Sequence, residues 1–117
     1  MTQDLKQLQS KLRQFTAERE WEKFHSPKNL AMALSGEAGE LLEHFQWLSE
    51  AQSRELSEAK RKEVALEMAD VLSYLLRLAD ELDIDLLAAL EEKIRINQDR
   101  YPVDKVRGNA KKYTELD

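Results

Sequence analysis

The chain contains no cysteine, which excludes disulfide bonds, thiolate zinc sites and cysteine nucleophiles. It has only three glycines and two prolines, and β-branched residues are scarce, so turns and strands have little support in the sequence. No uninterrupted apolar run approaches the roughly 18 residues of a membrane span. The N-terminal segment also lacks the apolar core of a secretory signal. We therefore expect an all-α protein of the cytoplasm, without a membrane partner.

Charge and length limit the possible binding partners and the number of domains. The 18 basic and 23 acidic residues give a formal net charge of −5 and a pI of about 5.2, which argues against binding to a nucleic acid polymer. The 117 residues have the size of one domain, and roughly two thirds of the surface of such a chain is buried on folding. We expect a single domain over residues 1–117, in which 103–117 form a polar, basic tail.

Apolar residues recur at spacings of three and four and predict four helices. The helices are expected over about 4–24, 29–48, 58–82 and 86–100. Ser57 and Asp85 are suitable N-caps for the third and fourth helices, and Pro102 ends the fourth. Short connections between four helices favour an antiparallel bundle.

The acidic residues do not all lie opposite the apolar faces. At 100° per residue, Glu37 falls near the middle of the apolar stripe of the second helix, and Glu40 lies about 60° from it. On the third helix, Glu67 and Asp70 flank the apolar face. A buried carboxylate without a partner costs several kcal/mol, so these positions need an explanation.

Two explanations remain open at this point. The acids can form an ordinary solvated seam, paired with basic neighbours such as Lys60, Arg61 or Lys93. Alternatively, if the second and third helices are neighbours, four oxygen ligands converge. An all-oxygen set without cysteine or histidine suits Mg²⁺ or Mn²⁺ rather than zinc or copper.

The acidic pattern resembles the signature of a known family. Glu37-x-x-Glu40, 26 intervening residues and Glu67-x-x-Asp70 are similar to the motif of the all-α MazG-type nucleoside triphosphate pyrophosphohydrolases. Further segments resemble the dCTP pyrophosphatase branch of that family: FTAEREWEKFH at 15–25, GEAGEL at 36–41, FQW at 45–47, KIRINQDRYPV at 93–103 and RGNAKKYTEL at 107–116. The resemblance covers nearly the whole chain.

The resemblance implies a reaction and a site. A nucleoside triphosphate, with dCTP or a modified dCTP as the expected substrate, is hydrolysed to the monophosphate and pyrophosphate. The catalytic and metal-binding residues would be Glu37, Glu40, Glu67 and Asp70, with Mg²⁺ as the cofactor and Mn²⁺ as a possible substitute. The family also implies a homo-oligomer, a tetramer built as a dimer of helical dimers.

Cations and aromatic residues complete the expected nucleotide site. Lys93, Asn97 and Arg100 fall within about 60° of one another on the fourth helix and are expected to contact phosphate, unless they are simply a solvated helix face. The resemblance places a second group at the nucleotide, consisting of Trp21, His25, Trp47 and Tyr74. Packing in a core or interface is the alternative for the two tryptophans. Vertebrate-type relatives carry a histidine where this chain has Leu12.

Two further observations bear on assembly and on other classes. Gly36 and Gly39 lie inside a predicted helix, where each costs about 1 kcal/mol relative to alanine. They are expected to admit a second chain or the substrate, unless they serve tight packing within the bundle. A non-catalytic helical oligomerisation module remains the alternative function. A di-iron bundle is disfavoured, because Glu22-x-x-His25 is a single ExxH motif and that architecture needs two.

Overall fold

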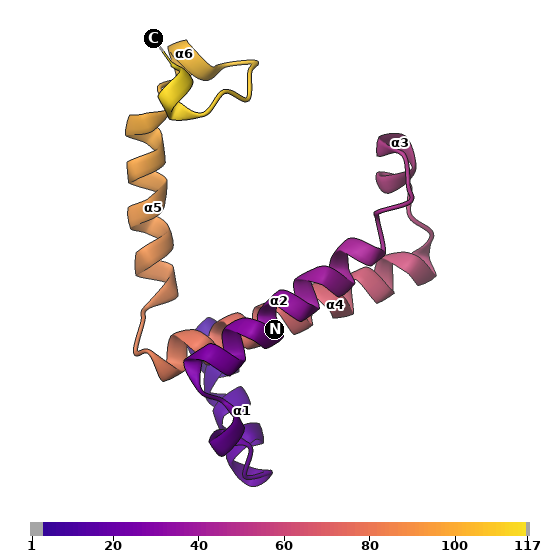
Figure 1. The fold of residues 1–117 in the computed structure, drawn as a ribbon, viewed down its shortest axis with the longest axis vertical. Coiled ribbons are helices and arrows are strands. Elements are labelled where there is room, and N and C mark those ends of the chain that lie inside the picture. The colour runs from indigo at the N-terminus through magenta and orange to yellow at the C-terminus, as the bar shows by residue number, and fades with distance from the viewer. Residues whose placement is uncertain (1–3, 117) are drawn as a thin grey trace. The chain divides into compact units, whose positions relative to one another are not determined.

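The computed structural model describes residues 4–116, and this part of the chain is helical and contains no strand. The elements in order are α1 (Leu5–Glu18), η1 (Glu22–Phe24), α2 (Pro27–Glu43), α3 (Glu50–Ser53), α4 (Glu58–Glu81), α5 (Leu86–Arg100), α6 (Val103–Val106) and η2 (Tyr113–Glu115). The all-α prediction is therefore confirmed (Figure 1).

The predicted N-caps of the third and fourth expected helices are confirmed. The Ser57 hydroxyl accepts a hydrogen bond from the Lys60 backbone N–H at 3.2 Å, and α4 begins at the next residue, Glu58. The Asp85 carboxylate accepts from the Ala88 N–H at 3.1 Å at the start of α5. Each side chain satisfies one of the backbone donors that a helix start leaves unpaired.

The first helix ends six residues earlier than the predicted Phe24. Glu20 has a φ of 54°, a left-handed conformation that cannot continue a right-handed helix. The chain turns back there, and the Trp21 N–H donates to the Thr16 carbonyl at 3.1 Å. The short helix η1 follows, so the segment from Trp21 to His25 is a turn rather than the end of α1.

The second helix begins at Pro27 and ends at Glu43, not at the predicted 29 and 48. Pro27 occupies the first turn, where its missing N–H costs nothing, and Ser26 is the N-cap. Tight turns follow, in which the Phe45 N–H donates to Leu42 at 2.9 Å. The polar stretch predicted between the helices contains the short helix α3, which Ser49 caps.

The structure divides into two compact units, one ending at Asp83 and one beginning at Ile84. In the first unit, α2 packs along most of α4, and α1 packs against α4 near one end (Figure 1). The loop that carries α3 joins α2 to α4, so these two helices form an antiparallel hairpin. The second unit holds α5, α6 and η2. The single domain and the complete four-helix bundle remain predictions.

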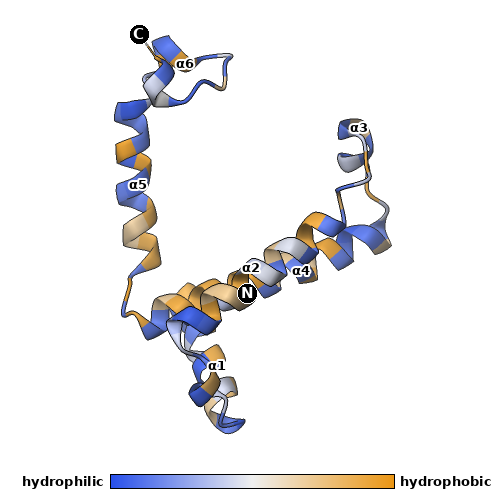
Figure 2. Ribbon diagram, viewed as in Figure 1, coloured by the Kyte–Doolittle hydropathy of each residue, from blue (hydrophilic) through white to orange (hydrophobic). Residues whose placement is uncertain are grey.

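The core of the first unit is small. The buried apolar residues of the described chain are Leu30, Val64, Leu76 and Ala79. Figure 2 shows apolar residues concentrated on α2 and α4. Several large apolar side chains on these helices nevertheless remain exposed, among them Met32, Leu42, Leu66 and Met68. Among the described helices, none is both long and apolar enough to cross a membrane.

Candidate metal centre and base pocket

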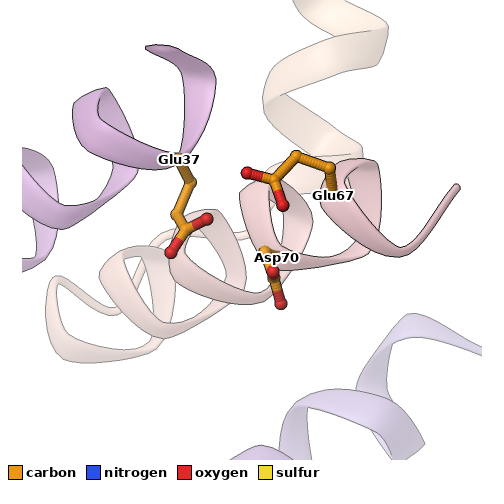
Figure 3. A group of neighbouring side chains, drawn as sticks. All are labelled: Glu37, Glu67 and Asp70. Atoms are coloured by element: carbon orange, nitrogen blue, oxygen red, sulfur yellow. The ribbon is translucent and has the colours of Figure 1, made fainter. Parts of the chain in front are cut away.

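Three carboxylates from two helices converge at the α2–α4 interface (Figure 3). Glu37 comes from α2, and Glu67 and Asp70 come from α4. One oxygen of each residue lies within 4.8 Å of the others, a separation that a single bound cation can span. The structure thus brings together three of the four acids that the sequence singled out.

Helix geometry explains why these side chains meet. Glu67 and Asp70 are three residues apart on α4, so they lie on the same face about one turn from each other. Glu37 occupies the side of α2 that faces α4, as its place in the apolar stripe predicts. Glu37 and Glu67 are half-buried, whereas Asp70 is exposed. The cluster therefore lies at the edge of the helix interface, with one open side.

The fourth acid, Glu40, belongs to the same electrostatic neighbourhood. Its contact with Glu67 is the largest cause that raises the pKa of that carboxyl group to about 7, and burial is the second. Burial is the main cause that raises the pKa of Glu37, followed by the contact with Glu40. The like charges repel and the interface removes water, and both effects disfavour the charged forms of Glu37 and Glu67.

The carboxylate oxygens of this cluster fit a hard divalent cation. Glu37 Oε2 and Glu67 Oε1 are buried, and no hydrogen-bond donor reaches them. Within residues 4–83, none of the four acids forms an ion pair with a lysine or arginine, and Lys60 pairs with Glu63 at 3.6 Å instead. A seam in which Lys60 or Arg61 pairs with these acids is therefore not what the first unit shows. Buried carboxylate oxygens without hydrogen-bond partners are suitable ligands for Mg²⁺, Mn²⁺ or Ca²⁺.

A pocket of about 90 Å³ lies further along α4, against α1 and the turn before α2. It contains three of the aromatic and imidazole residues that the resemblance placed at the nucleotide: Trp21, His25 and Tyr74. Its other lining residues are Leu12, Phe15, Thr16, Ser73 and Arg77. The pocket is smaller than the closed apolar cavity of about 150 Å³ that binds benzene, so a planar ring can enter it only in part, through the open rim.

Polar contacts fix α1 and the turn that form the pocket wall. Arg13 on α1 donates to both carboxylate oxygens of Asp80 on α4, at 2.8 and 2.6 Å, and this contact is the main cause that lowers the pKa of Asp80. Gln9 donates to the Leu76 carbonyl at 3.0 Å. The Asn29 side chain donates to the Phe24 carbonyl at 3.1 Å and ties the turn to the start of α2.

Two aromatic rings form the rim of the pocket. The rings of Phe15 and Trp21 meet edge to face, with centroids 5.7 Å apart, and the Arg19 guanidinium lies 3.7 Å from the centre of the Phe15 ring. These contacts restrict the orientation of Trp21, although it remains partly exposed. A fixed, half-open aromatic face is suited to stacking on a nucleobase.

His25 presents an unsatisfied nitrogen to this region. Its Nδ1 atom is buried and has no hydrogen-bond partner. Burial is the main cause that lowers the pKa of His25, and the nearby Arg77 charge adds to it, while Glu81 opposes both. The imidazole is therefore neutral at pH 7, with one nitrogen that donates and one that accepts.

Four predicted residues are not among those that line this pocket in the first unit. Trp47 follows α2 and is 86% exposed. Lys93, Asn97 and Arg100 lie on α5, in the second unit, and all three are exposed. They share one side of that helix, as their spacing predicts. Their roles at the nucleotide remain predictions.

Sequence reasoning missed Arg77. It interrupts the apolar run YLLRLAD at 74–80, yet only 4% of it is exposed. Nη1 donates to Asp80 at 3.1 Å, and Nη2 donates to Glu81 at 2.7 Å. The available signal was its position three residues after Tyr74, on the same side of the helix.

Comparisons with known proteins agree with this architecture. The family model described as MazG-like matches residues 32–116. The chain is 48% identical over 105 residues to dCTP pyrophosphatase 1 of Rattus norvegicus and 46% identical to that of Homo sapiens, and each match covers 88% of this chain. It spans 62% of the length of these curated relatives. The crystal structure of a pyrophosphatase from Archaeoglobus fulgidus superposes with a TM-score of 0.81 at 42% identity, covering 87% of this chain and 95% of that chain. The chain belongs to the MazG-like family.

Proposed function

We propose that the protein hydrolyses a deoxynucleoside triphosphate of the dCTP type to the monophosphate and pyrophosphate. The observation that carries this proposal is the order of groups along one side of α4. Glu67 and Asp70 are followed at helical spacing by Tyr74 and then Arg77, so the acidic cluster leads into the pocket. From Asp70 to Arg77 the helix rises about 10 Å. One nucleotide can therefore extend its phosphates to the acids and its base to the pocket.

The acidic cluster is the proposed cation site for the triphosphate. Glu37, Glu40, Glu67 and Asp70 would hold Mg²⁺, or Mn²⁺ in its place, and the bound cation supplies compensation for the charge on the phosphate oxygens. Water adds to phosphorus at the α–β phosphoanhydride, that bond breaks, and pyrophosphate leaves. One of the four carboxylates takes the proton of the attacking water. Without cations these carboxylates would repel the substrate.

Other side chains are proposed to grip the two ends of the substrate. Lys93, Asn97 and Arg100 contact phosphate oxygens through charge-assisted or amide hydrogen bonds. Trp21 and Trp47 stack on the base. Tyr74 follows the acids along α4, lines the pocket and contacts the sugar, where crowding at a 2′-hydroxyl favours deoxynucleotides. The dCTP pyrophosphatase names of the relatives support cytosine as the base.

We propose that the active form is a homo-oligomer, a tetramer of paired dimers. The exposed apolar residues on α2 and α4, which include Leu42 and Leu66 at 60% each, support burial against a second copy. A Cβ atom built on Gly36 or Gly39 meets no atom within 4 Å. Tight packing within the described chain therefore does not explain these glycines.

The test is incubation with each deoxynucleoside triphosphate and Mg²⁺, followed by separate detection of pyrophosphate and orthophosphate. We expect pyrophosphate, fastest from dCTP, and no orthophosphate. Glu37→Gln should abolish the signal, and Glu43→Gln, on the exposed side of the same helix, is the matched control that should retain it. If no triphosphate is consumed, the alternative of a non-catalytic oligomerisation module gains support. Release of orthophosphate would contradict the proposed bond cleavage.

A further inference from the structure

Arg77 is a charged residue at a buried position, where an uncompensated charge destabilises the folded state. It lines the pocket together with Tyr74 and residues of α1, and only 4% of it is exposed. Arginine stays protonated in proteins, so the full cation is retained there. Such a group needs either a structural or a functional explanation.

Part of the guanidinium has a structural explanation. Its two terminal nitrogens donate to Asp80 and Glu81 on the next turn of α4. Asp80 in turn accepts hydrogen bonds from Nε and Nη2 of Arg13. Two arginines and two carboxylates thus form a neutral network that fixes the Arg77 plane against the pocket wall.

The third donor group of Arg77 has no such explanation. Nε is buried and has no hydrogen-bond partner in the described chain. A buried donor left without an acceptor destabilises the folded state, and an acceptor on a bound ligand removes that penalty. The rest of the network prevents the guanidinium from turning to find another partner.

The chemistry of Arg77 differs from that of its neighbour His25. A neutral imidazole can donate or accept at Nδ1 by changing its tautomer, so His25 alone cannot reject a base that presents the opposite group. An arginine can only donate. A fixed donor therefore imposes a requirement for an acceptor on whatever base enters the pocket.

We propose that Arg77 is a specificity-determining residue, whose Nε–H donates to ring atom N3 of the substrate's base and so selects cytosine over uracil and thymine. This inference rests on the proposed function, since it assumes that a nucleobase occupies the pocket. Cytosine has an acceptor at N3, whereas uracil and thymine carry N3–H, which would oppose the Arg77 donor. The amino group of cytosine can then donate to His25 in its accepting tautomer.

The first experiment compares kcat/KM for dCTP and dUTP in three proteins. In Arg77→Met we expect the ratio of dCTP to dUTP to fall at least about fivefold, mainly through the KM of dCTP. Arg61→Met is the matched control. It removes an arginine from an exposed position of the same helix and lies outside the pocket lining, so it should leave the ratio within twofold. An equal fall of the ratio in both variants would overturn the role of Arg77 in selecting the base.

The second experiment removes the acceptor from the substrate and does not depend on the folding of a variant. In 3-deaza-dCTP a C–H group replaces N3. We expect the wild-type protein to use it about tenfold less efficiently than dCTP, and Arg77→Met or Arg77→Lys to reduce that difference to twofold or less. Equal efficiency of the two substrates in the wild type would overturn the role of Arg77 while leaving the proposed hydrolysis intact. Failure to hydrolyse any triphosphate would instead overturn the proposed function.

Discussion

Glu37 and Glu67 face each other across the α2–α4 interface, and each has a buried carboxylate oxygen that no donor reaches. Two such groups destabilise the protein without a cation and are well suited to hold one. This relationship predicts that stability, metal binding and activity depend on the same side chains.

Replacing one of these acids should separate catalysis from stability. In Glu37→Gln we expect turnover to fall at least about 100-fold, because the site loses a charged ligand. The melting temperature without metal should stay equal or rise, because a partly buried charge is removed. Pyrophosphate release and thermal denaturation check the two parts. Retained activity in excess chelator would contradict the proposed metal dependence.

The metal-free protein should lose stability as the pH rises. The pKa of Glu67 is raised from 4.5 in the unfolded chain to about 7 in the folded one, so the folded state binds the extra proton between these values. Its stabilising contribution is complete below pH 4.5 and is lost as the pH rises through about 7. Urea denaturation at pH 6 and pH 8 measures the change, and Glu67→Gln should reduce it. Adding Mg²⁺ at pH 8 should restore stability.

His25 should titrate below its ordinary range. Its pKa is lowered from 6.5, mainly by burial and also by Arg77. The neutral ring contributes stability above pH 6.5, and that contribution is lost as the pH falls through the folded value. NMR titration of the two histidine rings measures the pKa directly. In Arg77→Met the pKa of His25 should rise, because Glu81 then acts without its opposing cation. An unchanged titration would place Arg77 too far from the ring.

The protein should be associated in solution. Light scattering is expected to give a multiple of the 13.6 kDa chain mass, with four chains as the expected number. Leu42→Glu and Leu66→Glu place charges on exposed apolar positions of α2 and α4 and should reduce the mass, while the helical circular dichroism signal persists. Lys62→Glu, at an exposed polar position of α4, is the control. An active monomer would contradict the proposed assembly.

The glycines in α2 provide a separate test of the same surface. Gly39→Leu meets no atom of its own chain near Cβ, and glycine costs about 1 kcal/mol in a helix relative to alanine. The substitution should therefore not weaken the helix. We expect it to lower the mass measured by light scattering, because the longer side chain obstructs a close neighbour. A higher melting temperature with an unchanged mass would show that no chain approaches there.

The sequence by itself determined the features that depend on local interactions. Apolar spacing predicted the helices, and Ser57 and Asp85 were correct caps because a cap acts within three residues of its own position. The position of Glu37 in an apolar stripe predicted that its side chain faces a neighbouring helix, since helical periodicity fixes which residues share a face.

The tertiary structure decided what covers each face. The early end of α1 depends on the left-handed Glu20, whose side chain gives no signal of that conformation. The pocket requires α1 to lie on α4, through the pairing of Arg13 with Asp80, 67 residues later. The role proposed for Arg77 likewise depends on its position beside that pairing and beside His25, which the sequence does not show. Periodicity orients a side chain around its own helix axis, but the free energy of packing selects which distant helix it meets.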